Sequence, residues 1–426
     1  MLWSLAFRNA KRNVRRSALT ATTVSLGCAL LIIGLSWLTG VHGSFIQASI
    51  ESAGLVRIAT QDYVRREALL PIEYNLVNTD PLIQKLNAIE AADHIYPKIT
   101  QGVAASKNGT EIGEVFGLMI GAPLDYFEQI LNLPNKLSKG SFFDGQNNKQ
   151  VLIGQALAKD MNIEVGDEAI FLGQTQDGSI SPIKATVQGI VDTGNGVFDR
   201  QAYVPLNTAR WMADIPDGST ELLIYSKSDI NGSTLANRIS QIPSDELALL
   251  SGSLDEEGEV SRLKIQVWDD REPFGSTLKL ANLINGIMAI IIVFITALGV
   301  LNTMMMSVLE RTNEIGVLRA LGMKGKMVAQ LFIFEAMIIS SIGGVIGSAV
   351  GSAVSISMQS SGIDLGNMSA NLPDTMPINT TLYPHWDINL ALATTLLGLL
   401  MALIGAAIPA IRAVKIEPVE AMRSKH

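Results

Sequence analysis

The sequence predicts a membrane protein with four transmembrane α-helices, arranged one plus three, and a large α+β extracytoplasmic domain inserted between helices 1 and 2. Three observations support this fold class. Four long stretches almost lack charged residues, basic residues gather at their ends, and a segment of ordinary soluble composition separates the first stretch from the second. Of the 426 residues, 48% are hydrophobic and 17% are charged, a balance that is apolar for a soluble protein.

The four predicted membrane helices come from stretches that almost lack Asp, Glu, Lys and Arg. These stretches lie at residues 17–50, 280–309, 327–363 and 388–411. Each exceeds the roughly 20 apolar residues that cross a hydrocarbon core of about 30 Å, and Glu335 is the one charged residue inside them. We therefore expect transmembrane helices at residues 18–44, 276–309, 327–356 and 388–411.

Basic residues at the ends of these stretches predict the orientation of the chain. They are Arg8, Lys11, Arg12, Arg15 and Arg16, then Arg311, Arg319, Lys324 and Lys326, then Arg412, Lys415, Arg423 and Lys425. The loop at 357–387 instead carries three Asp and no Lys or Arg. Because Lys and Arg are enriched in cytoplasmic loops, we expect segments 1–17, 310–326 and 412–426 inside the cell, and 45–275 and 357–387 outside.

The first stretch could be read as a signal peptide or as a lipoprotein signal ending at Cys28. A run of this length far exceeds a signal core of 7–15 residues, which favours a retained membrane anchor. The apolar sequence "ALLIIGLSWL" continues after Cys28, so we interpret this cysteine as a small apolar residue of a membrane helix. With one cysteine in the sequence, the external domain must be stabilised by its own core rather than by a disulfide.

The segment 45–275 predicts alternating strands and helices. "VLIGQALAKDMNIEVGDEAIFLG" is typical of strand, helix, Gly-Asp turn and strand, and "IKATVQGIV", "RQAYVPL" and "STELLIYSK" indicate further strands. "TDPLIQKLNAIEAADHIYPKI" indicates a helix opened by Thr79 or Asp80 that leads into a strand. The acidic segment "LLSGSLDEEGEV" indicates a loop or a subdomain boundary.

Helices 1 and 2 are longer than a bilayer requires. The run from Leu280 to Leu309 would span about 45 Å as a helix. Such helices either tilt strongly or project from the membrane as a stalk for the external domain. Tilt accommodates only a modest mismatch, so we favour the stalk.

Polar and small residues inside the membrane helices are candidate packing sites. Gly343, Gly347 and Gly351 recur every four residues, a spacing that lets helix backbones approach closely, although glycine is also frequent in membrane helices generally. Asn302 can hydrogen-bond across helices. Glu335 is an intramembrane polar residue near the cytoplasmic interface; we expect it to pair with Arg319 or a lysine there rather than to take part in transport chemistry.

The sequence offers no constellation for catalysis. Its four histidines, His42, His94, His385 and His426, are scattered, and no G-x-x-x-x-G-K-[ST] loop is present. We therefore expect no catalytic residue, no metal site and no cofactor bound by this chain. A net charge of −8 without a basic patch on the external domain also argues against nucleic acid as a partner.

The stretch 310–326, "ERTNEIGVLRALGMKGK", is too polar for lipid and too apolar for a solvated loop. Read as a helix, it places its apolar residues around most of its circumference, and Arg311 can pair with Glu314. Membrane helix ends can cover one side, which leaves the other for a cytoplasmic protein. We therefore favour a docking element over an amphipathic surface helix.

The same stretch, extended to "ERTNEIGVLRALGMKGKMVAQLFIFEAMIIS", resembles the signature of FtsX-like permeases. These are the membrane subunits of type VII ABC transporters, a family that includes the macrolide exporter MacB and the lipoprotein-releasing permeases LolC and LolE. The ending "IPAIRAVKIEPVEAMR" and the beginning "RNAKRNVRRSALTATTVSLG" are also similar to this family. "VLIGQALAKDMNIEVGDEAIFLG" and "VWDDREPFG" look most like the lipoprotein-releasing branch.

The resemblance implies a coupling helix at 310–326 that docks on a cytoplasmic ABC ATPase subunit, a separate polypeptide that binds ATP and Mg. Carried over by position, the contact residues would be Glu310, Arg311, Glu314, Ile315, Gly316, Leu318, Arg319, Ala320, Leu321 and Gly322. The resemblance further implies a bacterial inner membrane, a periplasmic domain, and a second permease copy or sister permease. It favours a lipoprotein or other hydrophobic client taken from membrane lipid. Efflux with a periplasmic adaptor, or regulation of a cell-wall hydrolase, stay open as alternatives.

Overall fold

The computed structural model describes residues 2–12, 14–107, 115–145, 149–226, 230–255, 259–272, 274–364 and 381–415. They fall into two compact units, which we describe separately. The membrane unit comprises Met1–Gly43, Lys279–Ile363 and Leu382–His426, and the inserted domain comprises Ser44–Leu278 and Asp364–Thr381. Residues 365–380 of the predicted external loop and residues 416–426 of the predicted tail lie outside the described residues.

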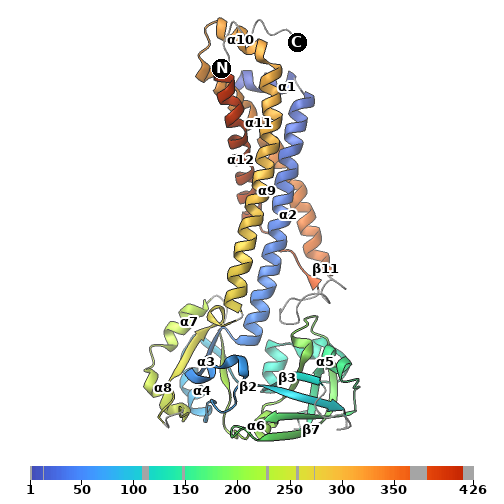
Figure 1. Ribbon diagram of the computed structural model, residues 1–426, viewed down its shortest axis with the longest axis vertical. Helices are drawn as coiled ribbons and strands as arrows, with labels where there is room; N and C mark the ends of the chain where they lie inside the picture. Colours follow the sequence, from blue (N-terminus) through green and yellow to red (C-terminus); the bar gives the residue numbers. More distant parts are fainter. Residues whose placement is uncertain are drawn as a thin grey trace. The chain divides into compact units, whose positions relative to one another are not determined.

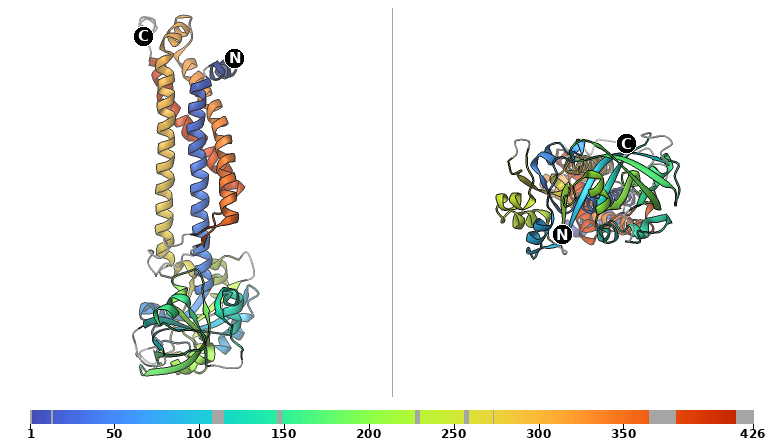
Figure 2. Two further views of the ribbon diagram at one scale, coloured as in Figure 1. Left: turned by 90° about the vertical axis from the view of Figure 1, so that its right-hand side faces the viewer. Right: turned by 90° about the horizontal axis from the view of Figure 1, so that it is seen from below.

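The membrane unit is built from helices. The described residues contain four candidate membrane spans, at Ser17–Ala53, Phe274–Glu310, Gly325–Ser361 and Ile388–Val414. These spans belong to α2 (Val14–Ala53), α9 (Phe274–Glu310), α11 (Gly325–Ser361) and α12 (Ile388–Lys415), and the shorter helices are α1 (Leu2–Arg12) and α10 (Thr312–Ala320). Figure 1 and the left view of Figure 2 show the four long helices running alongside one another.

Helices α2 and α9 extend past the spans that the sequence predicts at 18–44 and 276–309. They contain 40 and 37 residues, which corresponds to about 60 and 55 Å for straight helices, well beyond a hydrocarbon core of about 30 Å. The chain from Ser44 to Ala53 of α2 and from Phe274 to Leu278 of α9 belongs to the inserted domain. Each helix therefore continues without interruption from one unit into the other.

The inserted domain alternates short helices with strands. Its strands are β1 (Val56–Thr60), β2 (Ala92–Lys107), β3 (Val115–Ala122), β4 (Leu137–Gly140), β5 (Gln150–Gly154), β6 (Glu168–Gln174), β7 (Ile180–Val191), β8 (Gln201–Pro205), β9 (Glu221–Ser226) and β10 (Leu263–Val267). Its α-helices are α3 (Gln61–Arg65), α4 (Asp80–Asn87), α5 (Gln155–Asp160), α6 (Leu206–Ala213), α7 (Gly232–Ile239) and α8 (Ser244–Ser251). Two further short strands, β11 (Ile363–Asp364) and β12 (Thr381–Leu382), pair with each other.

The long strand β2 belongs to two sheet regions. Its first half pairs with β9 in an antiparallel sheet of order β10-β1-β9-β2. Its second half starts a closed path in which β2, β3, β8, β5, β7 and β6 pair in turn and β6 returns to β2. The domain thus joins a small open sheet to a barrel-like region through one strand (Figure 1).

Each region has its own core. In the closed region, side chains from every strand of the path meet in one apolar cluster that includes Val103, Phe171 and Val187. On the open sheet, α4, α7 and α8 cover one face through Leu82, Leu235 and Leu247. These buried aliphatic and aromatic groups supply the stability that a domain without disulfides requires.

The secondary structure of the inserted domain agrees with the sequence prediction. "VLIGQALAKDMNIEVGDEAIFLG" forms β5, α5, a turn and β6, and the other three predicted strands are β7, β8 and β9. The predicted helix after Thr79 is α4, and it leads into β2. The alternation of apolar residues in these segments therefore specified the elements correctly.

Candidate functional site

The connection between α9 and α11 forms a short helix flanked by two breaks. Helix α9 ends at Glu310, and Arg311 leaves the helical conformation with φ −101 and ψ 12 before α10 begins at Thr312. After α10, Gly322 adopts φ +95, a left-handed conformation that glycine takes without a steric penalty. The predicted coupling segment 310–326 is therefore α10 with the ends of its two neighbours.

One side of α10 is buried in the membrane unit. Ile315 packs in an apolar cluster with Val308 of α9, Val328 and Phe332 of α11, and Ala410 and Ala413 of α12. Gly316 is also buried, and the Arg319 guanidinium donates to the backbone carbonyl of Val414 at 2.8 Å. Helix α10 is thus fixed to three long helices at once.

A buried ion pair anchors the start of α10. The Arg311 guanidinium donates to the Glu335 carboxylate of α11 at 2.9 Å, and the side chains are only 7% and 4% exposed. Glu335 thus pairs with Arg311, a partner that the sequence analysis did not name for it. The break in the helix at Arg311 lets its side chain reach α11.

The other side of α10 is exposed. Leu321 is 81% exposed and Val317 is 45% exposed, and Glu314, Ala320 and Gly322 are exposed too. Glu314 forms an exposed ion pair with Arg12 of α1, with 2.6 Å between Nη2 and Oε1. We call Glu314, Val317, Ala320 and Leu321 the α10 face.

The ten residues predicted to contact an ATPase therefore divide into three groups. Arg311, Ile315 and Gly316 are buried within the membrane unit, so we expect them to support α10 rather than to contact a partner directly. Leu318 and Arg319 are half-buried, whereas Glu310, Glu314, Ala320, Leu321 and Gly322 are exposed. Val317, which the sequence-based set omitted, lies on the same exposed face.

The predicted glycine seam lies against α2. A Cβ atom at Gly343 would come within 2.5 Å of the Ala21 carbonyl oxygen, and one at Gly347 within 2.2 Å of the Ser25 carbonyl oxygen. A Cβ at Gly351 would meet the Cα of Ala29 at 2.9 Å. Small residues at four-residue spacing on both helices thus let the backbones of α2 and α11 touch.

The side chain of Asn302 is exposed in this chain, so its role in helix packing stays a prediction. The buried face of α9 here is set by Val300, Met304 and Val308, which repeat every four residues, and Asn302 falls on the opposite side of the helix.

A second cluster, in the inserted domain, was not found from the sequence. We call Arg57, Glu67, Lys98, Glu221 and Arg271 the junction network. Glu221 of β9 lies 3.2 Å from a nitrogen of each of Arg57, Lys98 and Arg271. Arg271 also contacts Glu67 at 2.7 Å, and Arg57 forms a close ion pair with Glu67.

The junction network lies where α2 ends and α9 begins. Strand β1, which follows α2, pairs with β10, which precedes α9. The Lys98 ammonium donates to the Ser52 carbonyl at 2.8 Å, and the hydroxyls of Tyr126 and Tyr225 donate to the Glu51 carbonyl at 3.0 and 2.9 Å. These groups satisfy carbonyls that a helix C-terminus leaves free, and Gly54 at φ +74 ends the helix.

Electrostatics hold Glu221 ionised although it is completely buried. Burial alone would raise the pKa of this carboxyl, but Arg271, Lys98 and Arg57 overcome that effect and hold the pKa of Glu221 well below its usual range. Burial lowers the pKa of Lys98, and Glu221 opposes the shift. A charged residue flanked by apolar neighbours, as in "VRIA" around Arg57, was the available sequence signal.

Within the described ranges, no three His, Cys, Asp or Glu side chains lie close enough together to hold a metal ion. What the arrangement offers is mechanical: α10 has one fixed and one exposed side, and the junction network joins both helix ends to one sheet.

Two family models match the chain, one in its C-terminal part and one in its N-terminal part. The FtsX-like permease C-terminal model matches residues 286–418, and the MacB-like periplasmic core domain model matches residues 17–242. The second match covers more than half of the 426 residues. The chain therefore belongs to the family of FtsX-like and MacB-like ABC transporter permeases, and the fold class predicted from the sequence is confirmed.

The chain is also similar to individual proteins whose names are those of ABC transporter permeases or lipoprotein-releasing systems. The chain is 25% identical over 432 residues to the macrolide export ATP-binding/permease protein MacB of Wolinella succinogenes, a match that covers 99% of this chain and 60% of that protein. It is 22% identical over 417 residues to the lipoprotein-releasing system transmembrane protein LolC of Xylella fastidiosa, covering 94% and 92%. The chain thus spans less than two thirds of that MacB and nearly all of that LolC.

A solved structure is also similar. The periplasmic region of MacB from Actinobacillus actinomycetemcomitans aligns with 54% of this chain and 95% of its own, at 15% identity and a TM-score of 0.37.

Proposed function

We propose that this chain is the permease subunit of an ABC transporter in a bacterial inner membrane, with both termini in the cytoplasm and the inserted domain in the periplasm. It pairs with a second copy or a sister permease and with ATPase subunits that bind ATP and Mg. ATP hydrolysis moves α10, and the movement reaches the inserted domain through α2 and α9. The basic residues near α1, α10 and the end of α12 support this orientation.

The exposure of the α10 face is the main support for this proposal. Leu321 and Val317 are exposed at the turn between two candidate membrane helices, although large apolar side chains gain free energy by leaving water. Three neighbouring apolar or small positions and one carboxylate fit a protein partner. We assign the ATPase contact to this face and not to the buried residues Arg311, Ile315 and Gly316.

The fixed side of α10 supports transmission of force. A push on the α10 face passes through the Ile315 cluster and the Arg311–Glu335 pair to α9 and α11. Because α9 continues into the inserted domain, its displacement reaches Arg271 and the junction network. A rigid junction converts helix movement into movement of the sheets rather than into local unfolding.

Lipoprotein extraction is the substrate proposal, and its support is the LolC relative, which matches along nearly its whole length. In this mechanism a hydrophobic client leaves the outer leaflet and enters the space beside the inserted domain, without crossing the bilayer. Efflux of small molecules or peptides is supported equally by the MacB relative, which matches 99% of this chain. Regulation of a cell-wall hydrolase is the third alternative, since the C-terminal family model is FtsX-like.

The test is purification of the tagged chain from its host in a mild detergent, followed by mass spectrometry and an ATP hydrolysis assay of the eluate. We expect an ABC ATPase with the wild type and its loss with Leu321→Asp. Leu69→Asp is the matched control, because Leu69 is 79% exposed on the inserted domain. Retention of the ATPase by Leu321→Asp would refute the assignment of the α10 face.

The co-purified proteins also separate the substrate alternatives. Acylated lipoproteins in the eluate support extraction, and a periplasmic adaptor together with drug sensitivity of a deletion strain supports efflux. A wall hydrolase without acylated proteins supports the regulator. If no ATPase is present while the protein remains folded, the coupling proposal fails for all three.

A further inference from the structure

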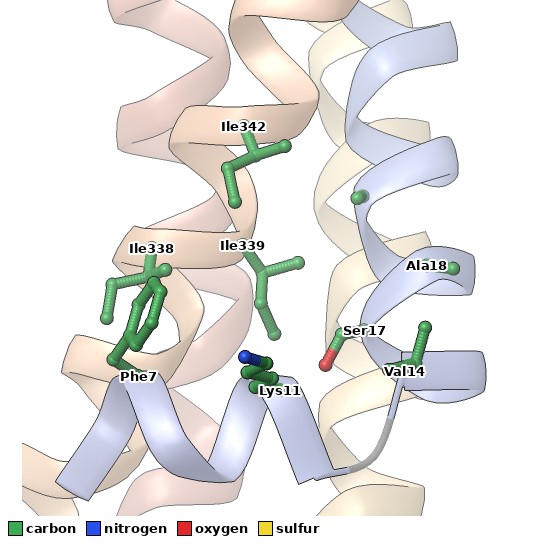
Figure 3. Close-up of a pocket in the computed structure, with 9 residues that line it drawn as sticks. Phe7, Lys11, Val14, Ser17, Ala18, Ile338, Ile339 and Ile342 are labelled. Carbon is green, nitrogen blue, oxygen red and sulfur yellow. The ribbon is translucent and has the colours of Figure 1, made fainter. Parts of the chain in front are cut away.

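A cavity in the membrane unit lies between α1, α2 and α11. It has a volume of about 310 Å³, at the lower end of the size of small-molecule sites. Phe7 and Lys11 of α1, Ala18 of α2, and Ile338, Ile339 and Ile342 of α11 line it, together with other residues of the first turns of α2. Figure 3 shows α1 lying across α11 next to the start of α2, with Phe7 and Lys11 directed toward the isoleucines.

Packing explains why the cavity exists. Trp3 of α1 stacks on Phe334 of α11 with ring centroids 5.1 Å apart, and Ala6 is completely buried. On the side of α2, the close contact with α11 begins at Ala21 and Gly343. Between these two contacts the helices stay apart, and the side chains present do not fill the space.

The charge on the lining of the cavity is positive. Its walls are almost entirely apolar, and Lys11 is its one charged lining residue. Arg8 and Arg15 lie close in sequence and are exposed, and none of the lining residues is acidic. Lys11 carries its ammonium on a long apolar stem, so it can place the charge at a membrane interface while the stem covers apolar surface.

The apolar lining and the ammonium of Lys11 together are complementary to an amphipathic ligand with a negative charge. We propose that this cavity binds one anionic phospholipid from the leaflet on the α1 side of the membrane. The headgroup phosphate pairs with the Lys11 ammonium, and an acyl chain lies along Ile338, Ile339 and Ile342 between α2 and α11. A free phosphate ion would gain nothing from the isoleucines, and a zwitterionic lipid would be attracted less strongly by the basic residues.

The site also has a structural consequence for the α10 face. Arg12, which follows Lys11, forms the ion pair with Glu314 of α10. A lipid bound in the cavity would therefore hold α1 in the orientation that makes this contact. The lipid site is independent of the proposed function, because it requires neither an ATPase nor a transported client.

Native mass spectrometry of the delipidated full chain tests the proposal, with phosphatidylglycerol or phosphatidylcholine of the same acyl composition titrated into detergent. We expect one phosphatidylglycerol to bind first and in preference to phosphatidylcholine. Ala18→Phe, which fills the cavity, should remove this first binding event. Leu19→Phe is the matched control, since Leu19 is 65% exposed and does not line the cavity. Equal binding of the two lipids, or unchanged binding by Ala18→Phe, would overturn the proposal.

The charge requirement is tested separately with an exposed residue whose replacement does not threaten folding. Lys11→Gln should weaken phosphatidylglycerol binding about fivefold, equivalent to about 1 kcal/mol, and should weaken phosphatidylcholine binding less. Lys326→Gln, at an exposed lysine of α11, should have no effect. An equal loss with both variants would show unspecific attraction, and displacement of the lipid by inorganic phosphate would show a simple anion site. Either result contradicts a phospholipid site.

Discussion

The inserted domain and the membrane unit both bury ion pairs, but they surround them differently. In the domain, the Glu221 carboxylate faces three cations and joins β1, β2 and β9 to the chain that leads into α9. In the membrane unit, Glu335 pairs with Arg311 and joins the end of α9 to α11. The contacts of Glu221 connect several strands of a sheet, whereas the contact of Glu335 fixes the end of one helix.

This difference shows how the two ends of α9 are held. A carboxylate that three cations share is hard to replace, because its removal leaves several buried positive charges in mutual repulsion. A single pair near a membrane interface leaves one charge, which nearby water can solvate more easily. We therefore expect the junction network to be the stiffer of the two attachments.

Glu221→Gln should produce the largest effect. Loss of the carboxylate leaves the three cations of Arg57, Lys98 and Arg271 with Glu67 as the one anion left in the network, and we expect a destabilisation of about 3–5 kcal/mol. Hydrogen exchange of the full chain in detergent should show lost protection in β1, β9 and β10. Glu168→Gln is the control, since its exposed pair with Lys184 should contribute at most about 1 kcal/mol. Equal effects of the two variants would contradict the special role of the network.

Glu335→Gln should have a smaller effect, confined to the membrane unit. The amide keeps one hydrogen-bond acceptor for Arg311, so we expect a loss of about 1.5–3 kcal/mol, seen as lower protection of α10 and of the ends of α9 and α11. The double variant Arg311→Met with Glu335→Leu removes both charges and should recover most of the stability. If the double variant is no more stable than Glu335→Gln, the unpaired buried charge is not the cause of the stability loss.

Acid should weaken the junction network gradually. The pKa of Glu221 is depressed in the folded domain, so the unfolded chain takes up the proton first, near the ordinary glutamate value of about 4. Stability is therefore present above that pH and falls below it, by at most about 1.4 kcal/mol per pH unit. Exchange in β9 measured between pH 6 and 3 should show this loss, and Glu221→Gln should lack this component.

Glu314→Gln should have the smallest effect on stability. Its pair with Arg12 is exposed, with 56% of the Glu314 side chain accessible, and exposed pairs contribute about 0–1 kcal/mol. Thermal unfolding of the full chain in detergent should change little, and Arg12→Gln should behave in the same way. A large loss would show that the ion pair holds α1 in place even without bound lipid.

Much of the fold could be predicted because runs and spacings of apolar residues along the sequence indicate helices without knowledge of distant contacts. The runs between Arg16 and Glu51 and from Leu280 to Leu309 predict long helices, since twenty apolar residues suffice to span a bilayer. The spacing of Gly343, Gly347 and Gly351 predicted close helix contact, and the structure supplies its partner, α2. Asn302 could not be placed, because a pattern of residue types does not tell which face of a helix meets its neighbours.

Ion pairs were predicted less well, for a geometric reason. The sequence suggested a pair between Arg311 and the nearby Glu314, whereas the structure places Arg311 against Glu335, 24 residues away on α11. In the junction network, Arg57 lies 164 residues from Glu221, and only the pairing of β1 with β9 brings them together. Contacts of this kind depend on the sheet order, which a single sequence does not reveal.

The sequence by itself determined the four membrane helices, the alternation of strands and helices in the domain, and the family, because periodicity and signature residues act along the chain. The tertiary structure alone decided which side of α10 is free and which partners Glu335 and Glu221 take. It also decided that α1 leaves a cavity beside α11. These properties depend on the distance between side chains from different elements, and packing fixes that distance.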